Sequence, residues 1–158
     1  MKTFVLEVTP TVSADGSTST FLYGTHAWAT APTDTPANTS VRPFLKEPGT
    51  LRRTLFSRDA FGGAIEPDYG VVRLADPAPS VSSASELDAW AGYGIAGSRV
   101  VLRWGELGAA YPAGFDTVWI AYARKHQAEI GSLTIWLRDG MQDLSLPIIT
   151  DGFSGAGG

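Results

Sequence analysis

Three segments in the last third of the chain alternate apolar and polar side chains and are separated by loops rich in glycine and proline. They are Arg99–Trp104, Phe115–Tyr122 and Leu133–Arg138. Alternation with a period of two is typical of strands that bury one face. Strands that follow one another through such loops favour antiparallel pairing. The pattern therefore predicts an antiparallel meander and constrains the chain to a mainly β fold.

The same alternation assigns the side chains of this meander to two faces. The apolar face is predicted to hold Val100, Leu102, Trp104, Val118, Ile120, Tyr122, Leu133, Ile135 and Leu137. The opposite face is predicted to hold Arg99, Arg103, Thr117, Trp119, Thr134, Trp136 and Arg138. Tryptophan and arginine are unusual on a solvated sheet and are enriched in interfaces. Either the N-terminal strands cover this face and close a small barrel or sandwich, or another subunit covers it. In the second case the interface residues are Arg99, Arg103, Trp119, Trp136 and Arg138.

A short helix is predicted just before the meander. Ser83 and Glu86 have the spacing of a capping box, which satisfies the first backbone donors of a helix. Leu87, Trp90 and Ala91 would then share one side of about two helical turns. We expect this helix to plug one end of the barrel through Leu87 and Trp90.

The first half of the chain is predicted to contain four further strands. Thr3–Val8 has the pattern of an edge strand, and Phe21–Trp28 would pair with it as a hairpin. Residues 30–49 contain four prolines and are interpreted as an ordered connection rather than an element. Leu51–Phe56 and Tyr69–Leu74 have the length and side chains of strands, with a loop between them.

The length of 158 residues suits a single β-rich domain over residues 1–150. Residues 76–82 are a candidate internal boundary. Residues 151–158 are too rich in glycine for a regular element and are interpreted as a linker or tail. We therefore expect the native product to continue past Gly158, or this tail to dock on a partner.

Composition narrows the classes of partner. The chain has no cysteine, which removes disulfides and cysteine metal sites. Its net charge of −4 gives no electrostatic case for nucleic acid. No apolar run approaches the roughly 20 residues that span a bilayer, and the N-terminus lacks the features of a signal peptide. We expect no nucleic-acid partner, no membrane insertion and no cofactor.

The sequence predicts no catalytic, metal-binding or cofactor-binding residue. A nucleophile elbow, a P-loop and a dinucleotide fingerprint are all missing. His26 and His126, the only histidines, have no carboxylate placed beside them in the sequence. An acid pair for glycoside hydrolysis could be drawn from Glu66, Asp68, Asp76, Glu86 and Asp88, but turns and a helix start account for these acids.

A series of segments in order resembles the N-terminal part of tail proteins from tailed bacteriophages and prophages. The segments are Asp34–Thr39, Arg53–Phe56, Tyr69–Leu74, Gly92–Arg99 with Val100–Gly105, and Leu133–Asp139. The resemblance covers the chain from about Phe21 to its end, and the order and spacing of the segments carry it. The chain has Ala75-Asp76-Pro77 where members of this family often have an Asn-Asp-Gly turn.

This resemblance implies a non-enzymatic structural virion protein of the tail tip or baseplate. Such a protein is assembled in the bacterial host cytoplasm, forms homo-oligomers around the tail axis and contacts other tail proteins. Two other functions remain open on the sequence. One is a carbohydrate-binding module for host-surface glycans, with Trp119, Trp136 or Tyr111 stacking on sugar rings. The other is a tail-associated hydrolase, which requires two of the acids above to converge.

Overall fold

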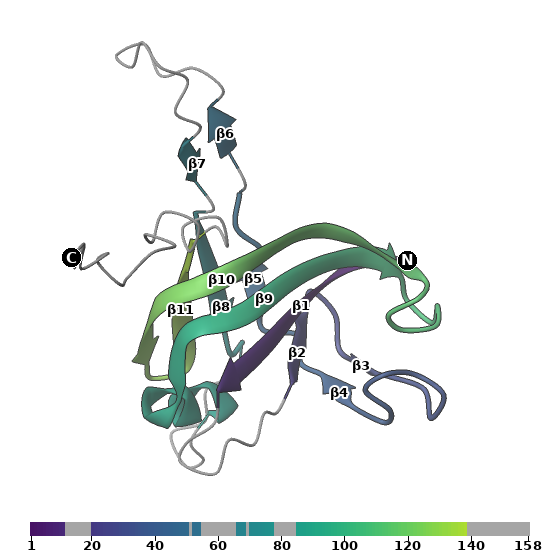
Figure 1. The fold of residues 1–158 in the computed structure, drawn as a ribbon. Helices are drawn as coiled ribbons and strands as arrows, with labels where there is room; N and C mark the ends of the chain where they lie inside the picture. The colour runs from purple at the N-terminus through teal and green to yellow at the C-terminus, as the bar shows by residue number, and fades with distance from the viewer. Residues whose placement is uncertain (12–19, 51, 55–65, 69, 78–84, 139–158) are drawn as a thin grey trace, which may run out of the picture.

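The computed structural model describes residues 1–11, 20–50, 52–54, 66–68, 70–77 and 85–138. These residues form a mainly antiparallel β structure with one short 3-10 helix, which confirms the predicted fold class (Figure 1). The elements in chain order are β1 Lys2–Thr11, β2 Phe21–Gly24, β3 Trp28–Ala29, β4 Ser40–Val41, β5 Leu45–Glu47, β6 Arg52–Thr54, β7 Glu66–Asp68, β8 Val71–Ala75, the helix η1 Glu86–Gly92, β9 Gly94–Glu106, β10 Phe115–Glu129 and β11 Ser132–Arg138.

Seven strands form one sheet in the order β2-β1-β9-β10-β11-β8-β5. The predicted meander is confirmed as β9, β10 and β11, and the predicted N-terminal hairpin as β1 and β2. The prediction of an edge position for the first strand is wrong, because β1 lies between β2 and β9. Strands β8 and β11 pair across the candidate boundary at residues 76–82, so elements from both sides of it share one sheet.

Short strands also occur where the sequence predicts only connections. β4 pairs with β3, and β5 pairs with β8 at the end of the large sheet, so the prediction of no element in residues 30–49 is wrong. β6 and β7 pair with each other, away from the large sheet, within a region predicted as a strand followed by a loop (Figure 1). Strands of two or three residues leave too weak an alternation to be recognised.

The large sheet curls strongly without closing into a barrel over the described residues (Figure 1). The chain between β4 and β5 crosses the gap between its two edges. The amide of Arg42 donates to the carbonyl of Leu22 at 3.1 Å, and the amide of Gly24 donates to the carbonyl of Arg42 at 2.7 Å. Arg42 thereby forms a single parallel bridge with Tyr23 of β2.

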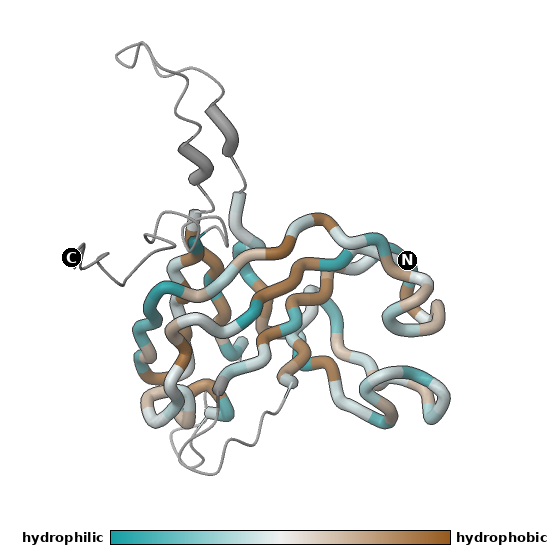
Figure 2. Tube along the Cα trace, in the orientation of Figure 1, coloured by the Kyte–Doolittle hydropathy of each residue, from teal (hydrophilic) through white to brown (hydrophobic). Residues whose placement is uncertain are grey.

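The main core fills the inside of the curled sheet, where hydrophobic residues follow the strands (Figure 2). Leu87 and Trp90 of the helix are fully buried in it, and the indole Nε1 of Trp90 donates to the hydroxyl of Tyr23 at 2.8 Å. The helix therefore occupies one end of the core, as predicted. Ala91 is exposed, so its predicted place on the buried side is wrong.

The helix is capped two residues later than predicted. The backbone amide of Leu87 donates to the Ser85 hydroxyl at 3.3 Å, and the amide of Ser85 donates to Asp88 Oδ2 at 2.8 Å. The capping box therefore consists of Ser85 and Asp88, whereas Ser83 lies outside the described residues. Both pairs have the spacing of a box, so the spacing alone does not distinguish them.

Strand β10 presents the opposite set of side chains to the core from the one predicted. Trp119 is 7% exposed and lies in the main core, whereas Val118 and Ile120 are 48% and 44% exposed. A β-bulge lies between Thr117, opposite Arg103, and Trp119, opposite Leu102. Because a bulge inserts one residue into the alternation, it turns Trp119 from the outer side to the inner side.

A second, smaller core lies on the other side of the sheet, near β1 and β2. It contains Val5, Leu22, Val41, Tyr111 and Phe115, with Trp28 and Ala109 packed against it. The ring of Trp28 stacks on that of Phe115 with centroids 5.7 Å apart. Strands β3 and β4 and the chain between β9 and β10 thus cover one end of the outer side of the sheet.

Candidate interaction face

The outer side of β9, β10 and β11 forms one continuous surface of basic, aromatic and aliphatic side chains. Residues directly opposite each other in an antiparallel pair lie on the same face. Tyr122 lies opposite both Arg99 and Arg138, and Lys125 lies opposite Trp136. We define the β9–β11 face as six side chains on this side beyond the second core: Arg99, Ile120, Tyr122, Lys125, Trp136 and Arg138. By the same register Val101, which is buried, and Gln127, Glu129, Ser132 and Thr134 also lie on this side.

Three of the five predicted interface residues lie on this face. They are Arg99, Trp136 and Arg138. Trp119 is in the main core instead, so its predicted position on the outer face is wrong. The sequence reasoning missed Ile120 and Tyr122, because it placed them inside the sheet, and Lys125, because it ended the strand at Tyr122. The extension of β10 to Glu129 brings Lys125 onto the face.

The end of the β9–β11 face nearest the second core exposes hydrophobic side chains, and Tyr122 lies in its middle, opposite Arg99 and Arg138. Ile120 is 44% exposed, and the neighbouring Val118 is 48% exposed. The ammonium of Lys125 lies 4.5 Å from the ring centroid of Trp136, within the range of a cation–π interaction. This interaction holds a basic side chain against the aromatic ring. The face therefore combines exposed aliphatic side chains at one end with a lysine held against an aromatic ring at the other.

Arg103, the fifth predicted interface residue, is engaged within the chain. Its Nε donates to Glu7 Oε2 at 2.7 Å, and the hydroxyl of Tyr111 donates to the same oxygen at 2.9 Å. The side chains of Arg103 and Glu7 are each only 16% exposed. A second guanidinium nitrogen of Arg103 donates to the Thr117 hydroxyl at 3.0 Å. This network links the second core to β1, β9 and β10.

The network is reflected in two shifted pKa values. Burial opposes the charge of Arg103, but the hydrogen bond and charge of Glu7 outweigh it and raise the pKa of the guanidinium. Burial also raises the pKa of Tyr111, and the Glu7 carboxylate raises it further. Tyr111 therefore stays protonated as the donor to Glu7, and Arg103 stays charged.

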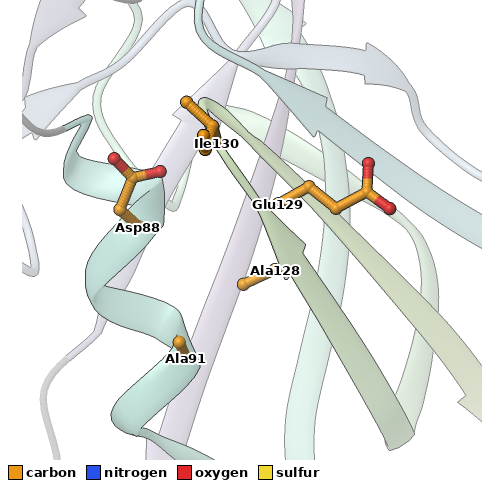
Figure 3. Close-up of a pocket in the computed structure, with 5 residues that line it drawn as sticks. All are labelled: Asp88, Ala91, Ala128, Glu129 and Ile130. Carbon is orange, nitrogen blue, oxygen red and sulfur yellow. The ribbon is translucent and has the colours of Figure 1, made fainter. Parts of the chain in front are cut away.

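A shallow groove runs between the helix and the turn that joins β10 to β11 (Figure 3). It is lined by Asp88, Ala91, Ala128, Glu129 and Ile130. Asp88 accepts hydrogen bonds from the amides of Ser85 and Gly131, at 2.8 and 2.9 Å. The carboxylate of Glu129 points away from Asp88 in Figure 3 and accepts from the Gln127 amide at 2.8 Å. The two acids of the groove do not converge.

The other acids considered for hydrolysis have separate partners. Asp76 Oδ2 accepts from the Ser85 hydroxyl at 2.9 Å, and Glu86 forms an ion pair with Arg42 at 2.8 Å. The side chains of Glu66 and Asp68, on β7, lie outside the described part of the structure. Asp76, Glu86 and Asp88 thus hold the helix start and its neighbours in place.

The two histidines occupy different settings from those predicted. His126, expected in a loop, lies within β10, and its Nε2 is 2.8 Å from the carbonyl oxygen of Trp90. A carbonyl only accepts, so this nitrogen carries the hydrogen and donates. His26, expected in a strand, lies between β2 and β3 and contacts the Thr25 hydroxyl. Over the described ranges, no group of three or more histidine, aspartate or glutamate side chains is placed to hold a metal ion.

Of the three aromatic residues considered for sugar stacking, two have no accessible ring face. Tyr111 is 2% exposed and Trp119 is 7% exposed. Trp136 is half-buried, and Lys125 lies over its ring. Of these three residues, only Trp136 could offer its ring to a sugar, and a cationic side chain already lies over that ring.

Comparisons with protein-family models and with curated proteins each gave no match for the chain. In the part of the chain that the structure describes, no helix has the length and hydrophobicity needed to cross a membrane.

Proposed function

We propose that this chain is a structural subunit of a bacteriophage tail tip or baseplate and acts through assembly with copies of itself and with other tail proteins. The resemblance of the ordered segments between Asp34 and Asp139 supports the assignment to a phage tail. The observation that carries the assembly role is the β9–β11 face, where Ile120 is 44% exposed and Arg99, Tyr122 and Trp136 lie on the same side of the sheet.

The composition of this face fits a protein contact. Aromatic and arginine side chains are enriched where interfaces gain most of their binding energy. Exposed aliphatic groups beside them add area that loses water when a partner packs there. Acidic groups elsewhere, such as Asp88 and Glu7, accept hydrogen bonds that hold the fold. The surface features therefore favour binding to proteins over chemistry.

The experiment is to locate the chain in purified phage particles. A particle preparation from a strain encoding the chain, analysed by quantitative mass spectrometry, is expected to contain it in a fixed ratio to the other tail proteins. An affinity tag on the chain, detected by labelled antibody in electron micrographs, is expected at the tail tip.

The control is an intracellular phage protein that is not packaged, which is expected to disappear during purification. If the chain is produced in the cell but is removed from particles together with that control, the proposed function is wrong. A label along the head or free of particles would contradict the tail location in the same way.

A further inference from the structure

The turn between β10 and β11 exposes an isoleucine at the groove shown in Figure 3. Ile130 is 92% exposed, more than any other large hydrophobic side chain in the described ranges. Ala91 of the helix and Ala128 of β10 line the same groove. A single exposed aliphatic side chain is ordinary on a protein surface. Here three apolar side chains from both walls line one groove, so a partner seated in it would remove apolar area from water on both sides.

The backbone of this turn is fixed to its neighbours. The amide of Gly131 donates to Asp88 Oδ1 at 2.9 Å, and the amide of Asp76 donates to the carbonyl of Gly131 at 2.8 Å. The second carboxylate oxygen of Asp88 accepts from the amide of Ser85 at the start of the helix. The two walls of the groove are therefore joined before any partner binds, which lowers the entropic cost of binding.

Two acidic side chains flank the apolar lining. Asp88 lies on the helix side of Ile130, and Glu129 precedes it on β10 with its carboxylate pointing away from Asp88 (Figure 3). A carboxylate has about four acceptor positions. In the described part of the chain, hydrogen bonds use two of these at Asp88 and one at Glu129. Both carboxylates therefore keep the capacity to accept from a donor on a partner.

Basic side chains around the groove are paired or distant. The paired ones form two ion pairs, Arg42 with Glu86 and Arg73 with Glu47. On β10, Arg124 and Lys125 lie at least four residues before Glu129, which is about 13 Å or more along a strand. The charged residues among the described lining of the groove are both acids. Charge complementarity therefore favours a cationic partner.

We propose that this groove binds a segment of a partner protein in which an aliphatic or aromatic side chain is flanked by lysine or arginine. The apolar side chain packs against Ile130, Ala91 and Ala128, and the basic side chains donate to Asp88 and Glu129. Because the groove is shallow, it suits side chains of a segment lying along it rather than a small ligand that must be enclosed. This inference goes beyond the proposed function, since it does not require the chain to belong to a phage tail.

The test is a titration of the nitrogen-15-labelled full chain with a short synthetic probe peptide, followed by NMR chemical shifts. The probe has one leucine between two pairs of lysines in a glycine and serine background. We expect saturable shifts at the amides of the groove residues, with binding that weakens at high salt. A probe with serine in place of leucine should bind about tenfold more weakly. A probe with glutamates in place of the lysines should leave the groove amides unshifted.

Two variants of the chain locate the contact. Ile130→Ser should raise the dissociation constant of the lysine probe about tenfold, and Glu129→Gln should raise it about threefold. Ile120→Ser and Glu106→Gln are the matched controls, because they remove an exposed isoleucine and an exposed glutamate outside the groove. Both controls should leave the dissociation constant unchanged. Unshifted amides far from each substitution show that the variants keep the fold.

Several results would overturn the proposed contact. One is the lack of any saturable shift with the lysine probe up to millimolar concentrations, and another is equal binding of the lysine and glutamate probes. Equal effects of Ile130→Ser and Ile120→Ser would show that the groove isoleucine has no special role. Shifts centred on residues away from the groove would place the binding site elsewhere.

Discussion

Replacing Trp119 by alanine tests the placement of every side chain on β10. The side chain of Trp119 is 7% exposed and packs in the main core. An aromatic side chain of this kind buries about 150–250 Å², which at about 25 cal/mol per Å² corresponds to about 4–6 kcal/mol. Because that figure is an upper estimate, we expect Trp119→Ala to lower the free energy of unfolding by about 3–5 kcal/mol.

Ile120 provides the matched comparison on the next residue. It is 44% exposed, so Ile120→Ala should lower the free energy of unfolding by only about 1 kcal/mol. Urea denaturation followed by far-ultraviolet circular dichroism measures both variants without relying on the tryptophan signal. A large loss for Ile120→Ala together with a small one for Trp119→Ala would refute the bulge and the resulting inward turn of Trp119.

Three further substitutions test the polar contacts. Glu7→Gln should lower the free energy of unfolding by about 1–3 kcal/mol, because it leaves the guanidinium of Arg103 without its carboxylate partner. Urea denaturation measures this, and a loss near zero would contradict the expected role of Glu7. Ser85→Ala should lower the free energy of unfolding by about 1 kcal/mol, because the helix loses its cap. The exposed Ser40→Ala should leave the free energy of unfolding unchanged. Burial raises the pKa of Tyr111, so above its ordinary value of 10.0 the unfolded chain loses a proton that the folded chain keeps. Stability then falls as pH rises, and Tyr111→Phe should make that fall shallower by up to about 1.4 kcal/mol per pH unit in urea titrations, whereas an unchanged slope would contradict the raised pKa.

The sequence predicted elements better than it predicted faces. Both sides of Phe115–Tyr122 carry apolar residues, so alternation alone leaves open whether Trp119 or Ile120 faces the core. The bulge after Thr117 decides this, and a bulge of one residue has no consistent sequence signal. The same error affected the predicted interface. It wrongly included Trp119, which is buried in the core, and omitted Ile120 and Tyr122, which lie on the outer face. Arg99, Trp136 and Arg138 were placed correctly because β9 and β11 alternate as expected near these residues.

Contacts distant in sequence account for most of the remaining differences. Nothing in Thr3–Val8 itself indicates that a strand near residue 100 will cover its second edge. Similarly, the role of Arg103 depends on Glu7 and Tyr111, which belong to other elements. Local patterns determine which residues form strands, whereas the order of strands depends on pairings that only the assembled sheet reveals.

The interior position of β1 has a consequence for how the protein is made. β1 is synthesised before β9 but pairs with it, and the last residue of β9 opposite β1 is Glu106. β1 therefore leaves the ribosome with the edge that faces β9 unpaired, and this edge stays unpaired until about a hundred more residues have been synthesised. During that interval only β2 is near in sequence, and an isolated two-stranded hairpin is marginally stable in water. Completion of the sheet must follow synthesis of the meander, so truncated translation products ending before β9 would expose a bare strand edge prone to aggregation.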